Sequence, residues 1–225
     1  MLTAEDWTAL GVSLRVAGLG AGLALAAAIP CALILARGRF PGRTLLDGLV
    51  NAPLVIPPVA SGFLLLTILG PRTPLGAGFE SVFGVRLAFS WVGAGLASAI
   101  GAFPFAVRAL KLGFERTPES LDQVAAELGA GAWDRFWSLT WPLAAPGALA
   151  AALMAFAVAL GEFGAVITFA ANIPGETQTL PLAIYTAIQS PGGDARALRL
   201  CALSIGVAVL AAVFAQAVRA ASMRR

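Results

Sequence analysis

Residues 11–36 read GVSLRVAGLGAGLALAAAIPCALILA, an apolar stretch with a single charged residue, Arg15. An α-helix rises about 1.5 Å per residue, so roughly 20 apolar residues cross the hydrocarbon core of a bilayer. Backbone polar groups cannot stay unpaired in lipid, and a stretch of this kind must therefore be helical. We predict a membrane-spanning helix over 11–36.

Four more stretches share this character, over 46–70, 87–107, 143–169 and 197–218. Their apolar residues are continuous and do not alternate, which excludes the strands of a membrane β-barrel. The chain has 225 residues, of which 59% are hydrophobic and 12% charged, whereas soluble domains have about 25% charged residues. The sequence predicts an all-α polytopic membrane protein, with about five transmembrane helices in a single domain over 1–225.

The first stretch differs from a cleaved signal peptide. Glu5 and Asp6 precede it, where a signal peptide has basic residues, and the stretch exceeds the roughly 7–15 residues of a signal core. We therefore interpret 11–36 as a retained membrane helix.

Basic residues between the stretches predict the orientation, since loops on the cytoplasmic side are enriched in Lys and Arg. Placing the C terminus inside leaves four basic residues outside (Arg72, Arg86, Arg196, Arg199) and ten inside (Arg37, Arg39, Arg43, Arg108, Lys111, Arg116, Arg135, Arg219, Arg224, Arg225). The five tryptophans then fall near the two membrane interfaces. We expect the N terminus outside and the C terminus inside.

Other functional classes fit the sequence poorly. The net charge of +3 comes from scattered residues and forms no basic patch for nucleic acid. There is no histidine, and Cys31 and Cys201 both lie within apolar stretches, so we predict no metal site, no cofactor and no catalytic residue. Lys111 is the only lysine and lies outside any G-x-x-x-x-G-K-[ST] phosphate loop, so ATP hydrolysis would need a separate subunit.

Small residues recur at four-residue spacing, as in Gly18 and Gly22 or Gly93, Ala97 and Gly101. Such spacing lets membrane helices approach closely. Prolines interrupt several stretches, Pro57 and Pro58 most strongly. These two either shape the bundle or bend a helix beside a substrate path.

The loop 117–142 between the third and fourth stretches predicts two short helices. Thr117 is a candidate N-cap, with Pro118 at the first helical position. Leu121, Val124 and Leu128 follow at helical spacing, and Gly129 is a suitable helix stop. The second helix carries four aromatic residues on one side, namely Trp133, Phe136, Trp137 and Trp141. Such a loop either lies on the membrane surface or fits into a groove of a partner.

This loop resembles the cytoplasmic signature of ABC importer permeases, E-A-A-x-x-x-G-x9-I-x-L-P, by which the membrane subunit contacts its ATPase. Ala125, Gly129 and Pro142 fall in register, while Gln123 stands where glutamate is usual. The resemblance implies a type I ABC importer permease fold. It assigns ATPase coupling to Asp122, Gln123, Val124, Ala125, Ala126, Glu127, Leu128, Gly129 and Pro142.

Two later segments, Gly161 to Gly164 and Asn172 to Thr177, are similar to the molybdate permeases of this family, and Val55 to Pro58 resembles the family as well. The resemblance places the translocation path or gate at Pro57, Pro58, Glu162, Phe163, Gly164, Asn172 and Thr177. An ionised Glu162 would repel an oxyanion. We expect its carboxylate to pair with an arginine or with backbone donors.

The resemblance further implies that this chain lies in a cell inner membrane. It also implies three partners: an ATP-binding subunit, a periplasmic molybdate-binding protein and a second copy of the permease. Nothing in the composition distinguishes molybdate from tungstate or sulfate, whose permeases are similar around Glu162 and Phe163. A membrane scaffold subunit without transport activity is the alternative from another class.

Overall fold

The computed structural model describes residues 2–222, which are largely helical and include no β-strand. The elements in chain order are α1 (Ala4–Arg37), α2 (Arg43–Asn51), the 3-10 turn η1 (Ala52–Leu54), α3 (Pro58–Leu69), α4 (Pro74–Phe83), α5 (Trp91–Phe114), α6 (Glu119–Glu127), α7 (Ala132–Arg135), the π-helical turn η2 (Phe136–Thr140), α8 (Trp141–Gly161), α9 (Gly164–Phe169), α10 (Leu180–Gln189) and α11 (Asp194–Ser222). Within the described range, four helices are long and apolar enough to cross a membrane, and a bent pair can supply a fifth span. The predicted all-α fold is confirmed.

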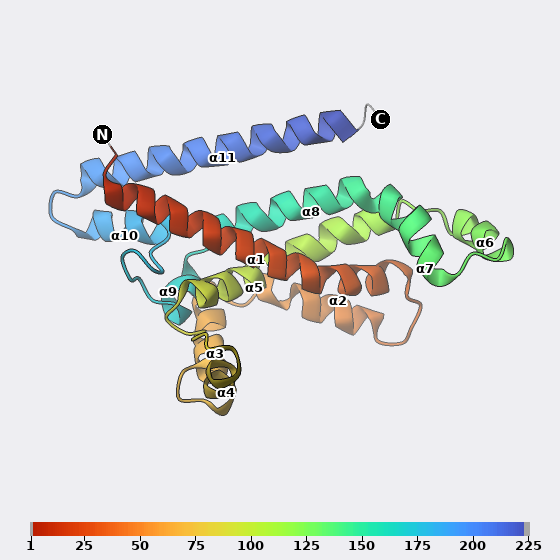
Figure 1. Ribbon diagram of the computed structural model, residues 1–225, viewed down its shortest axis with the longest axis horizontal. Coiled ribbons are helices and arrows are strands. Elements are labelled where there is room, and N and C mark those ends of the chain that lie inside the picture. The colour runs from red at the N-terminus through yellow and green to blue at the C-terminus, as the bar shows by residue number, and fades with distance from the viewer. Residues whose placement is uncertain (1, 223–225) are drawn as a thin grey trace.

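Helices α1, α5 and α8 form the centre of the molecule (Figure 1), with α5 packed against both of the others. Alanines fill most of their shared interface, including Ala17, Ala24 and Ala28 of α1, Ala102 and Ala106 of α5, and Ala151 and Ala155 of α8. Helices in lipid have little hydrophobic force to draw them together, so small side chains that permit close contact stabilise such a bundle.

Glycines mark the closest approaches, although not all at the predicted positions. A Cβ on Gly147 would lie 2.6 Å from Cα of Gly113, and one on Gly20 would lie 3.0 Å from Cβ of Ser98. A Cβ added to Gly18 or Gly22 would meet no atom of another element within 4 Å. Two residues turn a helix by about 200°, so Gly20 faces inward where its neighbours in the pattern face outward.

The second apolar stretch is not one straight helix. The residues Arg43–Leu54 and Pro58–Leu69 form two helical parts whose axes differ by 103°. Pro57 has an extended conformation and Pro58 opens α3. A residue before proline avoids the helical region, and proline itself has no N–H to continue a preceding helix. Consecutive prolines therefore break the helix expected over 46–70.

The single helix expected over 143–169 is also wrong. Helix α8 ends at Gly161, and Glu162 is extended. The chain then begins α9 at Gly164, where an added Cβ would lie 2.8 Å from Cβ of Pro58. The break allows α9 to turn away and pack against α3, an interaction that a straight helix would not make.

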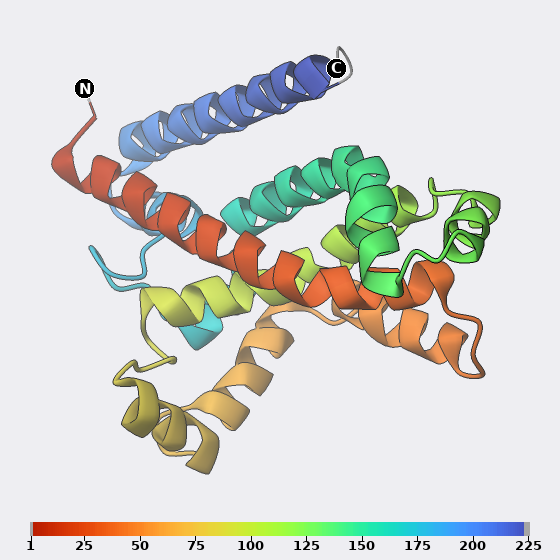
Figure 2. The same ribbon diagram turned by 45° about the vertical axis from the view of Figure 1, so that its right-hand side comes forward.

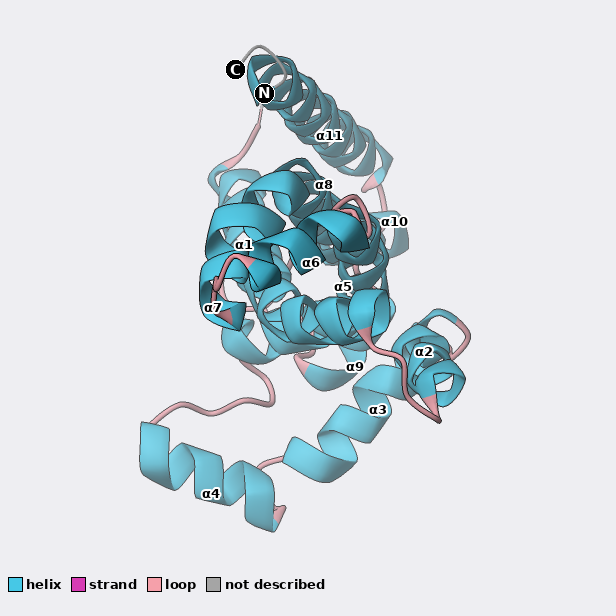
Figure 3. Ribbon diagram, turned by 90° about the vertical axis from the view of Figure 1, so that its right-hand side faces the viewer, coloured by secondary structure: helices cyan, strands magenta, loops and turns pink. Residues whose placement is uncertain are grey.

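Helices α4 and α10 lie outside the predicted spans. Helices α3 and α4 project from the bundle (Figure 3), while α10 packs against the first part of α11. Farther along, α11 runs separately from the central bundle (Figure 2) and exposes apolar residues such as Ile205 and Leu210. Helices α1 and α11 extend beyond the predicted spans 11–36 and 197–218 at both ends. Helix α5 is shifted relative to the predicted span 87–107, because it begins at Trp91 and ends at Phe114.

Candidate functional site

Helices α6 and α7 lie together at one end of the bundle, beyond the last turns of α1 and α5 (Figure 1). On α6 and its C-cap, the predicted apolar stripe is turned to the surface. Leu121, Val124 and Leu128 are 44%, 51% and 82% exposed. This stripe has no covering element in the described part of the chain, and its apolar surface is available to a partner.

The end of α6 follows the prediction. Gly129 has φ +88°, and its N–H donates to the carbonyl of Ala126 while the N–H of Ala130 donates to that of Ala125. This pair of bonds is a Schellman motif, whose left-handed position favours glycine. Gly129 is confirmed as the helix stop.

The start of α6 differs from the prediction. Pro118, not Thr117, is the N-cap, and the helix begins at Glu119. The N–H of Thr117 donates to the carbonyl of Phe114, which keeps Thr117 in the turn that ends α5. Its side chain is buried there and cannot cap α6.

Ion pairs lie within the loop and between the loop and the end of α1. Asp122 Oδ1 lies 3.4 Å from Nη1 of Arg37 and 3.3 Å from Nε of Arg135. Arg39 pairs with Glu119 at 2.9 Å on the surface. A cavity of about 470 Å³ is lined by Arg37, Arg39, Glu119 and Asp122, together with the last turn of α5.

The second loop helix continues into α8 without a break in the chain of helical residues. The rings of Trp133, Phe136, Trp137 and Trp141 contact one another, mostly edge to face, with neighbouring centroids 5.2–6.1 Å apart. Pro142 follows the π-helical turn η2. A wider turn accommodates the missing N–H and the ring of a proline inside a helix.

Of the seven predicted path residues, Pro58 and Glu162 come together at the break between α8 and α9, and three others are near them in the chain. Pro58 and Glu162 line a cavity of about 20 Å³, with Gly101 of α5 on its other side. Pro57, Phe163 and Gly164 adjoin them in the chain. A volume of this size holds about one water molecule, so the cavity is closed to a tetrahedral oxyanion in this conformation.

Glu162 has the type of partner expected from the sequence. Its Oε1 accepts a hydrogen bond of 3.1 Å from the N–H of Ala165 in the first turn of α9. A carboxylate is favourable there because the N–H groups of a helix start are unpaired. Its Oε2 would lie 2.9 Å from a Cβ on Gly101, a distance that explains the glycine at that position.

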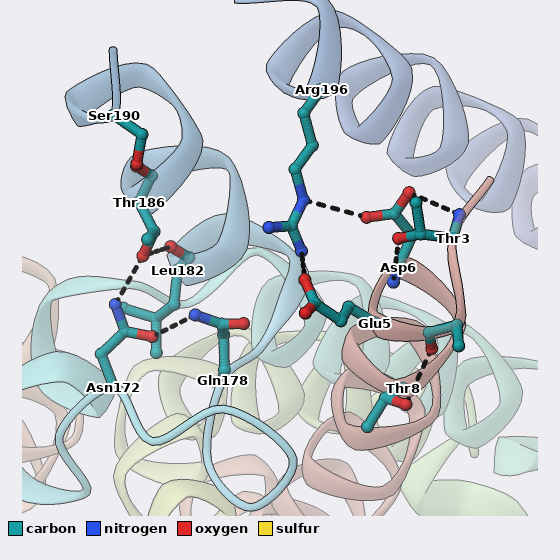
Figure 4. A network of polar contacts seen from close by, with 11 residues as sticks. Thr3, Glu5, Asp6, Thr8, Asn172, Gln178, Leu182, Thr186, Ser190 and Arg196 are labelled. Carbon is teal, nitrogen blue, oxygen red and sulfur yellow. Dashed lines mark hydrogen bonds and ion pairs between the residues drawn. The ribbon is translucent and has the colours of Figure 1, made fainter. Parts of the chain in front are cut away.

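Asn172 and Thr177 lie elsewhere, in the loop before α10; Figure 4 shows Asn172 with its partners. Asn172 donates to the hydroxyl of Thr186 and accepts from Gln178, at 2.8 and 2.9 Å. The hydroxyl of Thr177 accepts from the N–H of Ile173, and the side chain is buried. These groups fold the loop on itself and do not join Glu162 at the cavity.

A second polar cluster was missed by the sequence interpretation. Arg196 of α11 contacts Asp6 at 3.2 Å and Glu5 at 2.8 Å in the first turn of α1 (Figure 4). Asp6 is fully buried and also accepts from the N–H of Thr3 in a capping box. The signal was present, because Thr-x-x-Asp before an apolar run is close to a capping-box pattern.

Comparisons with known proteins find relatives of this chain among transport permeases. The chain is 45% identical, over 96% of its length and 94% of the relative's, to the molybdenum transport system permease protein ModB of Escherichia coli (strain K12). It is 33% identical, over 82% of its length and 65% of the relative's, to the sulfate transport system permease protein CysW of Synechococcus elongatus.

The fold also matches a solved structure. A bacterial ABC transporter involved in the import of the acidic polysaccharide alginate superposes with a TM-score of 0.73 at 20% identity, over 99% of this chain and 80% of the other. Residues 28–224 match the family described as the binding-protein-dependent transport system inner membrane component. The chain belongs to this family of inner membrane transport permeases.

Proposed function

We propose that this chain is the membrane-spanning permease subunit of an ATP-driven importer that carries molybdate across the inner membrane. Two findings support the proposal. The ModB relative is 45% identical to this chain over nearly its whole length. In addition, α6 exposes apolar side chains that a partner could cover and ends sharply at Gly129. ATP is hydrolysed by a separate subunit, and a periplasmic binding protein selects the anion and delivers it.

The exposed stripe on α6 is the observation that carries the proposed ATPase contact. Leu121, Val124 and Leu128 expose apolar surface on a short, sharply terminated helix, which is the form of a helix that enters a groove. Movement of the ATPase would displace this helix, and the bundle joined to it would open or close the cavity at Glu162.

A pull-down tests this contact. Val124→Asp should reduce association with the ATP-binding subunit by at least about tenfold, because a buried charge without a partner opposes docking. Ala132→Asp adds the same charge at the exposed start of α7, outside the predicted contact, and should associate normally. Equal association of both variants and the unmodified protein would place the ATPase elsewhere.

We further propose that two copies form the translocation path and that the N terminus faces the periplasm. The exposed apolar face of α11 supports a contact with a second copy or with lipid. The excess of basic residues in the segments assigned to the cytoplasm, ten against four, supports the orientation.

Sulfate is the second candidate substrate, because a sulfate permease is among the relatives. Tungstate is close to molybdate in charge and shape and belongs to the same test. Competition by unlabelled anions against the uptake of labelled molybdate distinguishes molybdate from sulfate as the substrate. Unlabelled molybdate should compete strongly and sulfate weakly, whereas dominant competition by sulfate would reassign the substrate.

A further inference from the structure

The last turn of α1 is joined through one side chain to both ends of the coupling loop, the segment 117–142 that carries α6 and α7. Nη1 of Arg37 lies 3.4 Å from Oδ1 of Asp122 on α6, and Nη2 donates a 2.8 Å hydrogen bond to the hydroxyl of Thr140 at the end of η2. Asp122 and Thr140 lie on either side of the turn that contains Gly129. Arg37 therefore connects three elements that are distant in sequence.

Arg135 completes this arrangement, which we call the Arg37 clamp (Arg37, Asp122, Arg135 and Thr140). Its Nε lies 3.3 Å from the same Asp122 oxygen, and its Nη1 donates to the carbonyl of Ala130, directly after Gly129. The carboxylate of Asp122 thus lies between two guanidinium groups. Helices α6 and α7 are tied to each other as well as to α1.

Burial distinguishes the clamp from the neighbouring surface pair. The side chains of Arg37, Asp122 and Arg135 are 34%, 26% and 24% exposed, and Thr140 is fully buried. In the pair Arg39–Glu119 the two side chains are 80% and 73% exposed. Water and salt screen such an exposed pair, which contributes little, whereas partly buried charges keep more of their interaction. The chain thus contains its own matched control.

We propose that Arg37 is a positioning residue that makes α1, the coupling loop and the start of α8 move as one body when the ATPase displaces the loop. The inference rests on the proposed function. Helix α1 packs along α5 and α8, so a loop fixed to α1 passes its displacement to the whole bundle. With the clamp broken, the loop would move without the bundle, and less molybdate would be transported for each ATP hydrolysed.

The test uses the complete transporter in lipid vesicles, with molybdate taken up per ATP hydrolysed as the readout. Arg37→Gln should lower this ratio by at least about fivefold, the lower end of coupling energies between sites. Arg39→Gln, the control, should leave the ratio unchanged. In Arg37→Gln/Asp122→Asn the loss should be smaller than the sum of the losses in the two single variants, because the effects of contacting residues are not additive.

Thr140→Val keeps the size of the side chain and removes only its acceptor from Arg37, so it serves as a second test should Arg37→Gln fail to assemble. It should lower the ratio while the ATP-binding subunit still copurifies. A normal ratio of molybdate uptake to ATP hydrolysis in assembled Thr140→Val or Arg37→Gln would overturn the proposed role of Arg37. A loss proportional to lost assembly in both variants would also overturn it, since the role would then be structural. If the unmodified transporter shows no ATP-dependent uptake, the proposed function fails instead.

Discussion

Gly129 shows how one backbone conformation shapes the site. Its φ of +88° lies in the left-handed region and allows the Schellman motif that ends α6. A side chain in this conformation is disfavoured by about 1–2 kcal/mol. Gly131 lies two residues later with an ordinary φ of −64°.

Gly129→Ala should therefore fray the end of α6 and weaken ATPase association by several-fold, in line with that strain. Gly131→Ala makes the same chemical change without it and should be near normal. Pull-down of the ATP-binding subunit compares the two. Equal association would mean that the helix stop does not matter for docking.

For single residues, the sequence correctly predicted the features that depend only on neighbouring residues in the chain. The stop at Gly129 depends on residues next to it, and it was predicted correctly. Thr117 was predicted as an N-cap, but α5 holds it in its final turn, and this requires knowing where α5 ends. The inward position of Gly20 in place of Gly18 and Gly22 likewise depends on how α1 is rotated against α5.

Among the elements, the break at Glu162 is the feature that the sequence did not reveal. Glu162 is the only charged residue in the run 143–169, so hydropathy alone favours a single helix. The packing of α9 on α3 decides against it, and that contact joins distant segments. The bend at Pro57 and Pro58 was easier to anticipate, because proline acts locally.

Gly164→Ala tests the contact between α9 and α3. The added Cβ would lie 2.8 Å from Cβ of Pro58, which forces the helices apart. Overpacking of this kind costs about 1–3 kcal/mol, so thermal stability and uptake should both fall. Gly161→Ala, with no other element within 4 Å, is the control and should behave normally. Normal behaviour of Gly164→Ala would show that the contact is loose.

Helix α11 is joined to α1 by the cluster around Arg196. Asp6→Ala should lower the free energy of unfolding by about 1–3 kcal/mol, because it leaves the Thr3 N–H without its acceptor and removes the buried partner of Arg196. Glu5→Ala removes a carboxylate that is 75% exposed and should cost less than about 1 kcal/mol. Denaturant or thermal unfolding in detergent measures both. A larger effect at Glu5 would contradict the assigned roles.

For the whole molecule, the number of membrane helices and the all-α class could be predicted because lipid permits few structures. The orientation remains a prediction from charge. After Cys31 and Cys201 are changed to Ala, Ala77→Cys should react with an impermeant thiol reagent outside intact cells, and Glu127→Cys should be protected. Both positions are exposed in the structure. The opposite labelling pattern would show that the predicted orientation is wrong and that the α6–α7 loop lies in the periplasm.

The central claim is that this chain imports molybdate only through partners that supply energy and substrate. Vesicles containing the permease and its ATP-binding subunit should accumulate labelled molybdate when ATP is on the side of the α6–α7 loop and the loaded binding protein is on the other side. Removal of either should abolish accumulation. Accumulation driven by a proton or sodium gradient without ATP would contradict the claim.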